Sequence, residues 1–258
     1  MSKKYKKSRK SNDFIEIYGF HAVNAALKNS NRTHKKLIIY QNLLDKYKYL
    51  QNKIEEIISI PNSKFIKLYG NEKNHQGIIL ITSKIKQPDI KDIINNLKNK
   101  EIDLVVILDH VTDPQNIGSI IRSCALFNCS SVIVSKNNSP EITSSMMKAA
   151  SGAIEIVNYI KVTNLSRIIE KFKQHNYWVT GFDNNKKNSN NNIDLAKKSL
   201  LVFGSEDKGL RELTKKECDQ IIKIPVKTNK QFKIDSLNIN NACTLALYEH
   251  YIKYNHKK

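Results

Sequence analysis

Polar residues that could do chemistry come directly after an apolar segment in the middle of the chain. Leu104–Leu108 is short, apolar and rich in β-branched residues, which is typical of a strand buried on both faces of a parallel sheet. A turn follows, and Asn116 is placed to cap a helix that has an apolar side. Ligands of open α/β sheets bind where strands end and helices begin. We therefore expect Asn116, Gly118 and Arg122 to lie at the functional site.

A second turn of this kind begins at Gly204, directly after the apolar residues 200–203. A glycine there lets a ligand approach the backbone closely, although a plain tight turn also favours glycine. Glu206 follows at once and a helix is expected to open at Gly209, so we favour the ligand interpretation. The sequence contains neither G-x-G-x-x-G nor G-x-x-x-x-G-K-[ST], so a dinucleotide site or a P-loop is poorly supported.

The elements around these turns predict an α/β fold. From residue 101 onward strands and helices alternate, as in a parallel sheet flanked by helices. The expected strands are 104–109, 131–135, 155–161, 177–182, 199–203 and 220–224, and the expected helices are 116–127, 142–150, 164–175, 209–216 and 238–254.

The first part of the chain predicts a smaller α/β domain at residues 13–83. Its expected elements are helices at 18–27 and 43–58 and strands at 36–40, 64–68 and 77–81. Residues 84–100 are polar and contain a proline, so we expect a linker with a short helix. Residues 1–12 are rich in lysine and predict a disordered basic tail, which leaves residues 101–258 as the larger domain.

The charge of the chain predicts a polyanionic partner. The 258 residues carry 43 Lys and Arg against 24 Asp and Glu, a formal net charge of +19. This excess favours nucleic acid ahead of a membrane surface. Lysine is enriched along the whole chain, so the alternative is a general bias of composition without a basic patch.

The compartment is expected to be the cytoplasm. No apolar stretch approaches the roughly 20 residues of a membrane span, and the N-terminus lacks the apolar segment of a secretory signal. An organellar transit peptide is the weaker alternative. The four cysteines have no metal-ligand spacing, so we expect buried free thiols in a reducing compartment and no metal site.

Three motifs together resemble the SpoU-type RNA ribose 2′-O-methyltransferases, the TrmH branch of the SPOUT superfamily. They are Asn116–Arg122 (NIGSIIR), Gly204–Leu210 (GSEDKGL), and Ile224-Pro225-Val226 followed by Ser236–Ile239 (SLNI). Their order and spacing over about residues 101–254 make the resemblance specific. Ser151-Gly152-Ala153 fits a recurrent tripeptide of the family, and residues 18–81 are similar to its ribosomal-protein-like substrate-binding domain.

The resemblance implies a SPOUT-type trefoil knot in the C-terminal domain, with S-adenosylmethionine as the cofactor. On this likeness, the backbone around Gly204, Ile224, Val226 and Leu237 holds the adenosine part, whereas ordinary core packing is the alternative for Ile224 and Leu237. The implied catalytic residues are Asn116, Arg122, Glu206, Ser236 and Asn238. A helix cap is the alternative role for Ser236. Family enzymes form homodimers through the last helix, here 238–254, and complete the active site across that interface.

The implied reaction is attack of a ribose 2′-hydroxyl on a sulfonium methyl group. The methyl donor is already activated, so positioning the reactants is most of the task. An arginine is effectively always protonated, which makes Arg122 a poor base. Arg122 could instead bind the adjacent phosphate and stabilise the developing alkoxide, while Glu206 or a substrate phosphate takes the proton.

The resemblance thus predicts a methyltransferase acting on ribosomal RNA, with guanosine as the first choice of nucleotide. The alternatives are a transfer RNA methyltransferase and a non-catalytic RNA-binding protein of ribosome assembly. The chain departs from the family pattern in several places, among them Asn240-Asn241, where small residues are usual. His110 and Asn128 stand where the family has glycine, and the segment 226–235 is longer than usual and basic.

Overall fold

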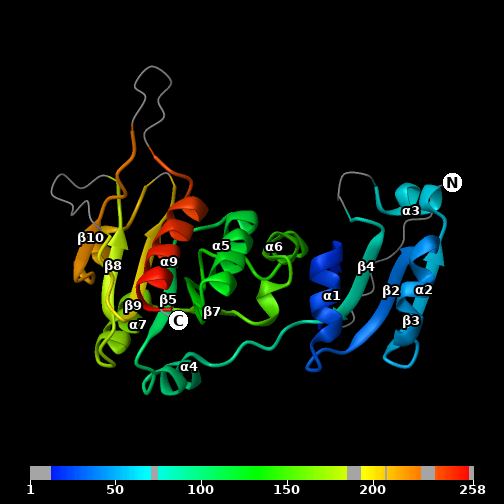
Figure 1. The fold of residues 1–258 in the computed structure, drawn as a ribbon, viewed down its shortest axis with the longest axis horizontal. Helices are drawn as coiled ribbons and strands as arrows, with labels where there is room; N and C mark the ends of the chain where they lie inside the picture. Colours follow the sequence, from blue (N-terminus) through cyan, green and yellow to red (C-terminus); the bar gives the residue numbers. More distant parts are fainter. Residues whose placement is uncertain (1–12, 71–74, 185–192, 207, 228–235, 256–258) are drawn as a thin grey trace. The chain divides into compact units, whose positions relative to one another are not determined.

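The chain folds into two compact units, residues 1–85 and 86–258 (Figure 1). The computed structural model describes residues 13–70, 75–184, 193–206, 208–227 and 236–255. No helix within these ranges is long and apolar enough to cross a membrane. Each unit has its own sheet.

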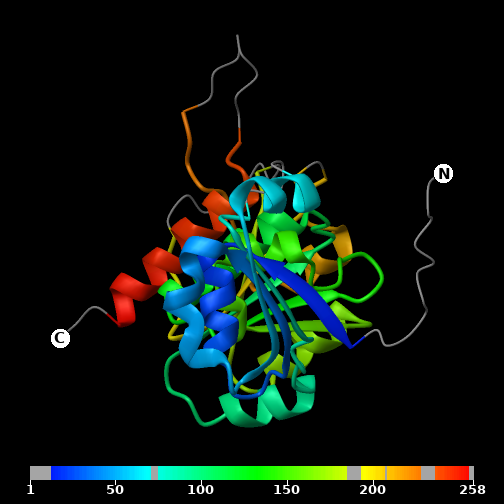
Figure 2. The same cartoon turned by 90° about the vertical axis from the view of Figure 1, so that its right-hand side faces the viewer.

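The first unit is a four-stranded sheet with the order β1-β4-β2-β3, seen from a second direction in Figure 2. Strands β2 and β3 are parallel, and β4 runs antiparallel to both β1 and β2. The strands are β1 (Phe14–Tyr18), β2 (His34–Tyr40), β3 (Ile54–Ile60) and β4 (Ile78–Ser83). The helices are α1 (Phe20–Lys28), α2 (Leu44–Tyr47) and α3 (Asn62–Tyr69), with short 3-10 turns at Gln41–Leu43 and Lys48–Leu50.

Two predicted elements of this unit are wrong. The helix expected at 43–58 forms only in its first half. The second half belongs to strand β3, in which Ile57 and Ile58 pair with Leu37 and Ile38 of the parallel strand β2. Such β-branched residues fit a pleated sheet better than a helix. The strand expected at 64–68 is helix α3, which inserts Phe65 into the small core beside Ile38.

The second unit is a six-stranded parallel sheet with the order β10-β8-β9-β5-β6-β7, which confirms the predicted fold class. The strands are β5 (Asp103–Asp109), β6 (Ser131–Ser135), β7 (Asn158–Val162), β8 (Trp178–Phe182), β9 (Lys198–Gly204) and β10 (Gln220–Ile222). The helices are α4 (Ile90–Leu97), α5 (Pro114–Leu126), α6 (Ser144–Ala150), α7 (Leu165–Lys173), α8 (Glu212–Lys216) and α9 (Ile239–Tyr254), with a 3-10 turn at Ala153–Glu155.

Helices cover both faces of this sheet. Strand β5 is buried at every residue, as its continuous apolar sequence predicts. Its residues Val105 and Ile107 pack in one core with α4 and α7, so the helix expected within 84–100 belongs to the second unit. Helix α5 packs against α6 and α9. Gly118 makes the close approach of α5 to α6 possible, because a Cβ there would lie 2.4 Å from the carbonyl oxygen of Met146.

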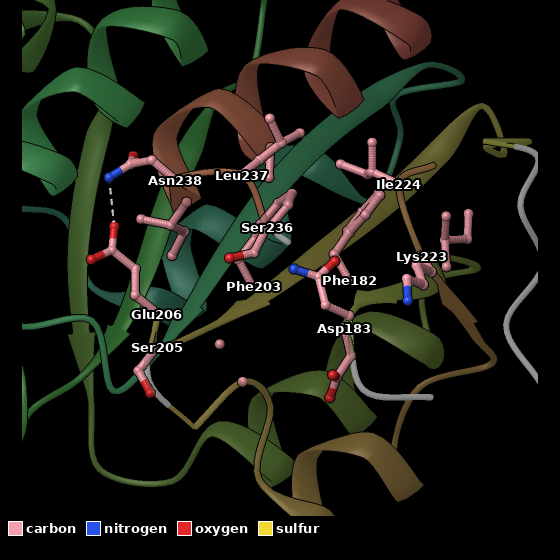
Figure 3. A pocket seen from close by; sticks show the side chains of 16 residues that line it. Phe182, Asp183, Phe203, Ser205, Glu206, Lys223, Ile224, Ser236, Leu237 and Asn238 are labelled. Atoms are coloured by element: carbon pink, nitrogen blue, oxygen red, sulfur yellow. Dashed lines mark hydrogen bonds between the residues drawn. The ribbon is translucent and has the colours of Figure 1, made fainter. Parts of the chain in front are cut away.

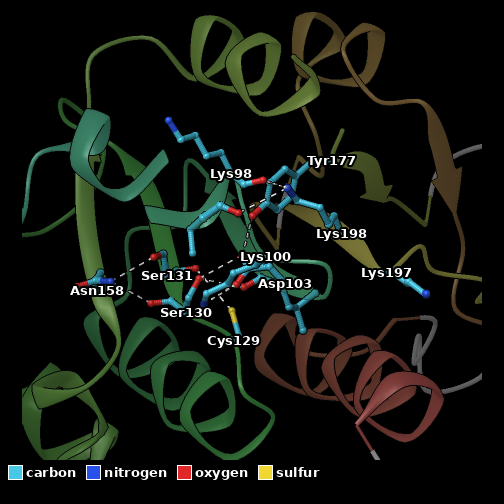
Figure 4. A network of polar contacts seen from close by, with 12 residues as sticks. Lys98, Lys100, Asp103, Cys129, Ser130, Ser131, Asn158, Tyr177, Lys197 and Lys198 are labelled. Atoms are coloured by element: carbon cyan, nitrogen blue, oxygen red, sulfur yellow. Dashed lines mark hydrogen bonds and ion pairs between the residues drawn. The ribbon is translucent and has the colours of Figure 1, made fainter. Parts of the chain in front are cut away.

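A buried polar network fixes the amino-terminal edge of the sheet (Figure 4). Asp103, at the start of β5, accepts a hydrogen bond from Tyr177 Oη at 2.8 Å and pairs with Lys100 Nζ at 3.1 Å. Burial, and then the charge of Asp103, raise the pKa of Tyr177 well above its ordinary value. The phenol therefore stays protonated and donates to the carboxylate across the physiological pH range.

Two expectations about where the motif helices begin are wrong. Asn116 does not cap α5, because Asp113 accepts hydrogen bonds from the backbone N–H groups of Gln115 and Asn116, and Pro114 occupies the first helical position. Gly209 does not open a helix, because it has φ +64° within a turn and α8 begins only at Glu212. The cap of α9 is Asn238.

The predicted trefoil knot depends on the path of the chain between β10 and α9. Residues 228–235 of this connection lie outside the described residues. The knot therefore stays a prediction, as does any role of the longer basic segment within 226–235.

Candidate active site

A cavity of about 740 Å³ lies where the carboxyl ends of β8, β9 and β10 meet the start of α9 (Figure 3). Parallel strands place their carboxyl ends at one edge of a sheet, which is where ligands of open α/β sheets bind. Six of the predicted site residues line this cavity: Gly204, Glu206, Ile224, Ser236, Leu237 and Asn238. Asn116, Arg122 and Val226 are not among its lining residues.

One wall of the cavity is apolar and flat. The rings of Phe182 and Phe203 stack with their centroids 4.6 Å apart and their planes at 6°. Ile224 and Leu237 extend this wall, as Figure 3 shows. Such a surface suits a planar heterocycle, since π systems prefer offset stacking and apolar contacts.

The other side of the cavity carries a carboxylate held by amides. Glu206 Oε1 accepts hydrogen bonds from Asn238 Nδ2 at 2.6 Å and from Asn116 Nδ2 at 3.1 Å. Asn116 Oδ1 in turn accepts from Asn240 Nδ2 at 3.4 Å. Both amides donate to Oε1. Oε2 is therefore the carboxylate oxygen that could accept a proton, or a hydrogen bond from a hydroxyl group. Three predicted catalytic residues from distant parts of the sequence thus meet at one point.

Gly204 is required by the fold of the loop that follows it. A Cβ on Gly204 would lie 2.0 Å from the carbonyl carbon of Gly209, and Gly209 N donates back to Ser205 O at 2.8 Å. The glycine therefore permits a tight turn that aims Glu206. Its role in the turn is the alternative to direct contact with a ligand, although Gly204 also lines the cavity.

A buried carboxylate at the end of β5 anchors the same loop. Asp109 is fully buried and binds the guanidinium of Arg211 with both oxygens, at 3.0 Å to Nε and 2.8 Å to Nη2. Thr214 Oγ1 donates to Asp109 at 2.7 Å, and His110 Nδ1 lies 3.0 Å from its other oxygen. These contacts join β5 to the segment that begins at Gly204.

A second charged pair lies on the cavity wall. Asp183, directly after β8, has a fully buried side chain, and Lys215 Nζ lies 2.9 Å from its Oδ2. The hydrogen bond to Asp183 raises the pKa of Lys215 above its ordinary value. Lys215 therefore stays charged at neutral pH, and Asp183 forms a polar end of the cavity away from Glu206, as Figure 3 shows.

Arg122 lies apart from this constellation within the chain. Its side chain is exposed on α5, and its Nη1 is 3.5 Å from Ser151 Oγ. Ser151 ends α6 in a left-handed conformation with φ 50°. The structure thus brings Arg122 to the Ser151-Gly152-Ala153 motif rather than to Glu206.

The described part of the chain offers no cluster of three His, Cys, Asp or Glu side chains that could hold a metal ion. Cys124, Cys129, Cys218 and Cys243 form no disulfide, and three of them are buried.

The sequence matches the models of two known families. The model of the "SpoU rRNA Methylase family" matches residues 103–248, more than half of the chain. The chain belongs to the SpoU rRNA methylase family. A second model, "RNA 2'-O ribose methyltransferase substrate binding", matches residues 17–88, which correspond to the first unit.

Relatives of this SpoU protein match about nine-tenths of its length. The 23S rRNA (guanosine-2'-O-)-methyltransferase RlmB of Coxiella burnetii is 35% identical over 240 residues, which are 90% of this chain and 93% of the relative. RlmB of Haemophilus influenzae is 34% identical over 241 residues, 91% of this chain and 96% of the relative. The SpoU methyltransferase AviRb of Streptomyces viridochromogenes, solved with AdoMet, shares the fold at a TM-score of 0.74 and 20% identity, over 93% of this chain and 90% of that one.

Sequence reasoning missed several residues of this SpoU site. Phe182, Asp183 and Phe203 line the cavity, and Asn240 supports Asn116. Asp183 directly follows a predicted strand, and ligands of such sheets bind at the carboxyl ends of strands, so its position could have suggested a site residue. The sequence does not give the strand order, however, and only the folded sheet shows that β8 lies beside β9.

Proposed function

We propose that this chain transfers a methyl group from S-adenosylmethionine to the ribose 2′-hydroxyl of a guanosine in 23S ribosomal RNA. The observation that carries the proposal is a cavity with an apolar wall that adjoins the Glu206, Asn116 and Asn238 network in a SpoU family member. Relatives named as 23S rRNA guanosine methyltransferases over nine-tenths of the chain support the substrate class.

The cavity suits S-adenosylmethionine in size and chemistry. Its volume of about 740 Å³ falls within the roughly 300–1,000 Å³ of small-molecule sites. The wall of Phe203, Ile224 and Leu237 would hold the adenine, and the polar ends at Asp183 and Ser236 would face the rest of the cofactor. The bound cofactor supplies an electrophilic methyl group, so the protein has only to orient it and to manage one proton.

The proton is assigned to Glu206. Its Oε1 accepts hydrogen bonds from the two amides, which orients the carboxylate and would leave Oε2 for an incoming hydroxyl. A positioned carboxylate within hydrogen-bond reach can accept the 2′-proton as the methyl group transfers. Arg122 would bind the neighbouring phosphate and offset the charge that develops on the ribose oxygen.

Arg122 can fill this role if the active enzyme is a homodimer. Helices α5 and α9 pack together, and the large apolar side chains Leu126, Leu245 and Tyr248 are 67%, 41% and 47% exposed. A surface of this kind marks an interface between proteins. We propose that this face pairs two copies, so that Arg122 of one subunit serves the cavity of the other.

The basic first unit and the compartment complete the proposal. The unit matches a substrate-binding model, and the chain carries a net charge of +19, so we assign RNA contacts to it. We place the enzyme in the cytoplasm, where a ribosomal RNA substrate and reduced cysteines are both expected.

The decisive experiment is transfer of labelled methyl from S-adenosylmethionine to unmodified 23S ribosomal RNA, with nuclease mapping of the product. Wild type should form one 2′-O-methylguanosine, and Arg122→Ala should lose this activity while it keeps its fold. Unmodified transfer RNA is the comparison substrate. Absence of transfer to ribosomal RNA, with binding to it intact, would refute the catalytic role.

Mixing two inactive variants tests the shared site. Arg122→Ala and Glu206→Ala should each be inactive alone, and mixed dimers should regain part of the activity because one of their two sites is intact. If both residues act within one chain, mixing restores nothing. Light scattering of the wild type supplies the oligomeric state.

A further inference from the structure

A second cavity, of about 350 Å³, lies at the carboxyl ends of β6 and β7. It shares no lining residue with the cavity of the proposed active site. Its walls come from the segment after β6, the start of α7 and the loop before α8. Nothing in the proposed mechanism uses it.

The first observation is a buried hydroxyl without a partner. Ser135, the last residue of β6, is 8% exposed and lines the cavity. Its Oγ makes no hydrogen bond to any described residue. Buried polar groups in folded proteins are almost always paired, so an unpaired hydroxyl in a cavity wall is available to hydrogen-bond a ligand.

The second observation is the start of helix α7 at the same cavity. Asn164 caps the helix by accepting from Arg167 N at 3.1 Å. The backbone N–H groups of Leu165 and Ser166, both lining residues, belong to the first turn and have no acceptor within the helix. The helix dipole adds partial positive charge at this end, so the cavity favours an anion.

The third observation is a guanidinium with a free nitrogen. Arg211 lines the cavity, and Asp109 uses only its Nε and Nη2. Nη1 has no partner among the described residues, and the side chain is 47% exposed. Asn138 is held in place by His110, whose Nε2 lies 2.7 Å from Asn138 Nδ2. No carboxylate is among the lining residues.

We propose that this cavity binds a phosphate group of the substrate RNA backbone. Hydroxyl, N–H and guanidinium donors converge there, whereas the lining residues include no aromatic ring for a base to stack on. The cavity and Glu206 follow strands of one parallel sheet at the same edge, and Asp109, Arg211 and His110 connect the two places. An RNA strand that presents its ribose to Glu206 therefore passes this edge. The proposal rests on the proposed function for its substrate.

The test places a negative charge in the cavity by Ser166→Glu. Ser166→Gln is the neutral control of matched size, and Gln174→Glu puts the same charge at the far end of α7. Affinity for a 23S ribosomal RNA transcript is measured by filter binding over a series of salt concentrations. Thermal denaturation reports stability, and calorimetry reports S-adenosylmethionine binding.

Ser166→Glu should weaken RNA binding about tenfold, and the slope of log affinity against log salt should fall by about 0.7 for each phosphate that the variant no longer binds. Gln174→Glu should bind RNA like wild type, Ser166→Gln should bind it more tightly than Ser166→Glu, and all variants should bind S-adenosylmethionine equally. The added carboxylate should not lower the melting temperature, because a negative charge at a helix N-terminus is stabilising. Equal affinity and slope for Ser166→Glu and Ser166→Gln would overturn the proposal.

Ser135→Ala provides an independent test. A hydroxyl that serves only the fold would stabilise it, so its removal would lower the melting temperature. An unpaired hydroxyl that serves a ligand predicts an unchanged or higher melting temperature with RNA affinity reduced about threefold.

Inorganic phosphate distinguishes the source of the anion. If phosphate raises the melting temperature of wild type but not of Ser166→Glu, and both bind RNA equally, the site takes a free anion and the RNA assignment is wrong. Methyl transfer by wild type is measured on the same transcript. Binding without transfer would refute the proposed activity yet leave the comparison of variants valid, whereas a wild type that does not bind the transcript would refute both.

Discussion

At the scale of single residues, Glu206 is the side chain on which the proposed chemistry depends. Its carboxylate is oriented by Asn116 and Asn238, which come from the starts of two different helices. Neither amide can take a proton, so the pair can only position the carboxylate. This division of roles leads to a direct prediction.

Glu206→Gln should reduce kcat for methyl transfer by about a hundredfold, because the amide keeps the size of the side chain but cannot accept a proton. The KM for RNA should change little. Glu212→Gln is the matched control, since Glu212 is an exposed carboxylate on α8. Steady-state kinetics on 23S ribosomal RNA measures both constants. Retention of near-normal kcat would remove Glu206 from the proton transfer.

A second residue, His250 of α9, predicts a pH dependence of stability. His250 is 1% exposed, its Nε2 lies 3.1 Å from Lys197 O, and its Nδ1 has no partner among the described residues. Burial lowers its pKa, and nearby Lys253 lowers it further, against opposing contributions from the Lys197 and Ala196 backbone and from Asp103. The folded state therefore holds the neutral ring below the pH at which the unfolded chain takes up a proton.

The free energy of unfolding should consequently fall as the pH drops below about 6.5, by at most about 1.4 kcal/mol per pH unit from this residue. His250→Gln keeps a donor for Lys197 O and should flatten the profile between about pH 5 and 7, the range in which an ordinary histidine titrates. His21→Gln, at an exposed position of α1, should leave the profile unchanged. Urea unfolding at a series of pH values measures the difference. Parallel profiles for wild type and His250→Gln would contradict this account.

At the scale of elements, the packing of α5 on α6 places both Asn116 and Arg122. Gly118 lies at the contact, where an added Cβ would be 2.4 Å from Met146 O and 2.7 Å from the Cβ of Ala149. Helix propensity alone would make Gly118→Ala stabilising by about 1 kcal/mol. The close contact between α5 and α6 predicts instead that Gly118→Ala lowers the stability of the protein.

Gly118→Ala should destabilise the protein by about 1–3 kcal/mol, because α6 has to move away from α5. Ser119→Ala on the same helix gains propensity without the collision and should be neutral or slightly stabilising. Thermal denaturation of the two variants gives the comparison. A more stable Gly118→Ala would show that the helices are not in close contact there.

Two left-handed residues show how elements constrain the sequence. His110 after β5 and Asn128 after α5 have φ of 61° and 57°, and the resemblance to the family leads us to expect glycine at both positions. Asparagine and histidine are among the residues that enter this region more readily than most. The substitutions therefore keep the turns, and His110 also gains its contacts to Asp109 and Asn138.

At the scale of the whole molecule, the two units divide the work in the proposed function. The second unit has a core of its own and contains all residues of both cavities. A protein of residues 86–258 should fold and bind S-adenosylmethionine within about threefold of the full chain. Its affinity for 23S ribosomal RNA should fall at least about tenfold, with a smaller salt slope, because the first unit no longer contributes its phosphate contacts. Calorimetry and filter binding test the two statements, and RNA affinity equal to that of the full chain would contradict them.

The sequence by itself determined much of the second unit. Its alternation of apolar strands and amphipathic helices predicts the parallel sheet, and the spacing of three motifs predicts the family and many of the cavity residues. The first unit was less predictable, because short segments such as 54–60 and 64–68 can satisfy a helical or a strand pattern. For residues 54–60, pairing of Ile57 and Ile58 with β2 selects the strand over the helix.

Only the tertiary structure decided how distant residues meet. The order of β8, β9 and β5 brings Asp183, Gly204 and Asp109 to one edge, and no local pattern encodes strand order. The same holds for the Glu206 network, whose amide donors are 90 and 32 residues away in sequence. Local sequence determines the type of each element through backbone preference and periodicity, whereas contacts between elements depend on how their buried surfaces fit together.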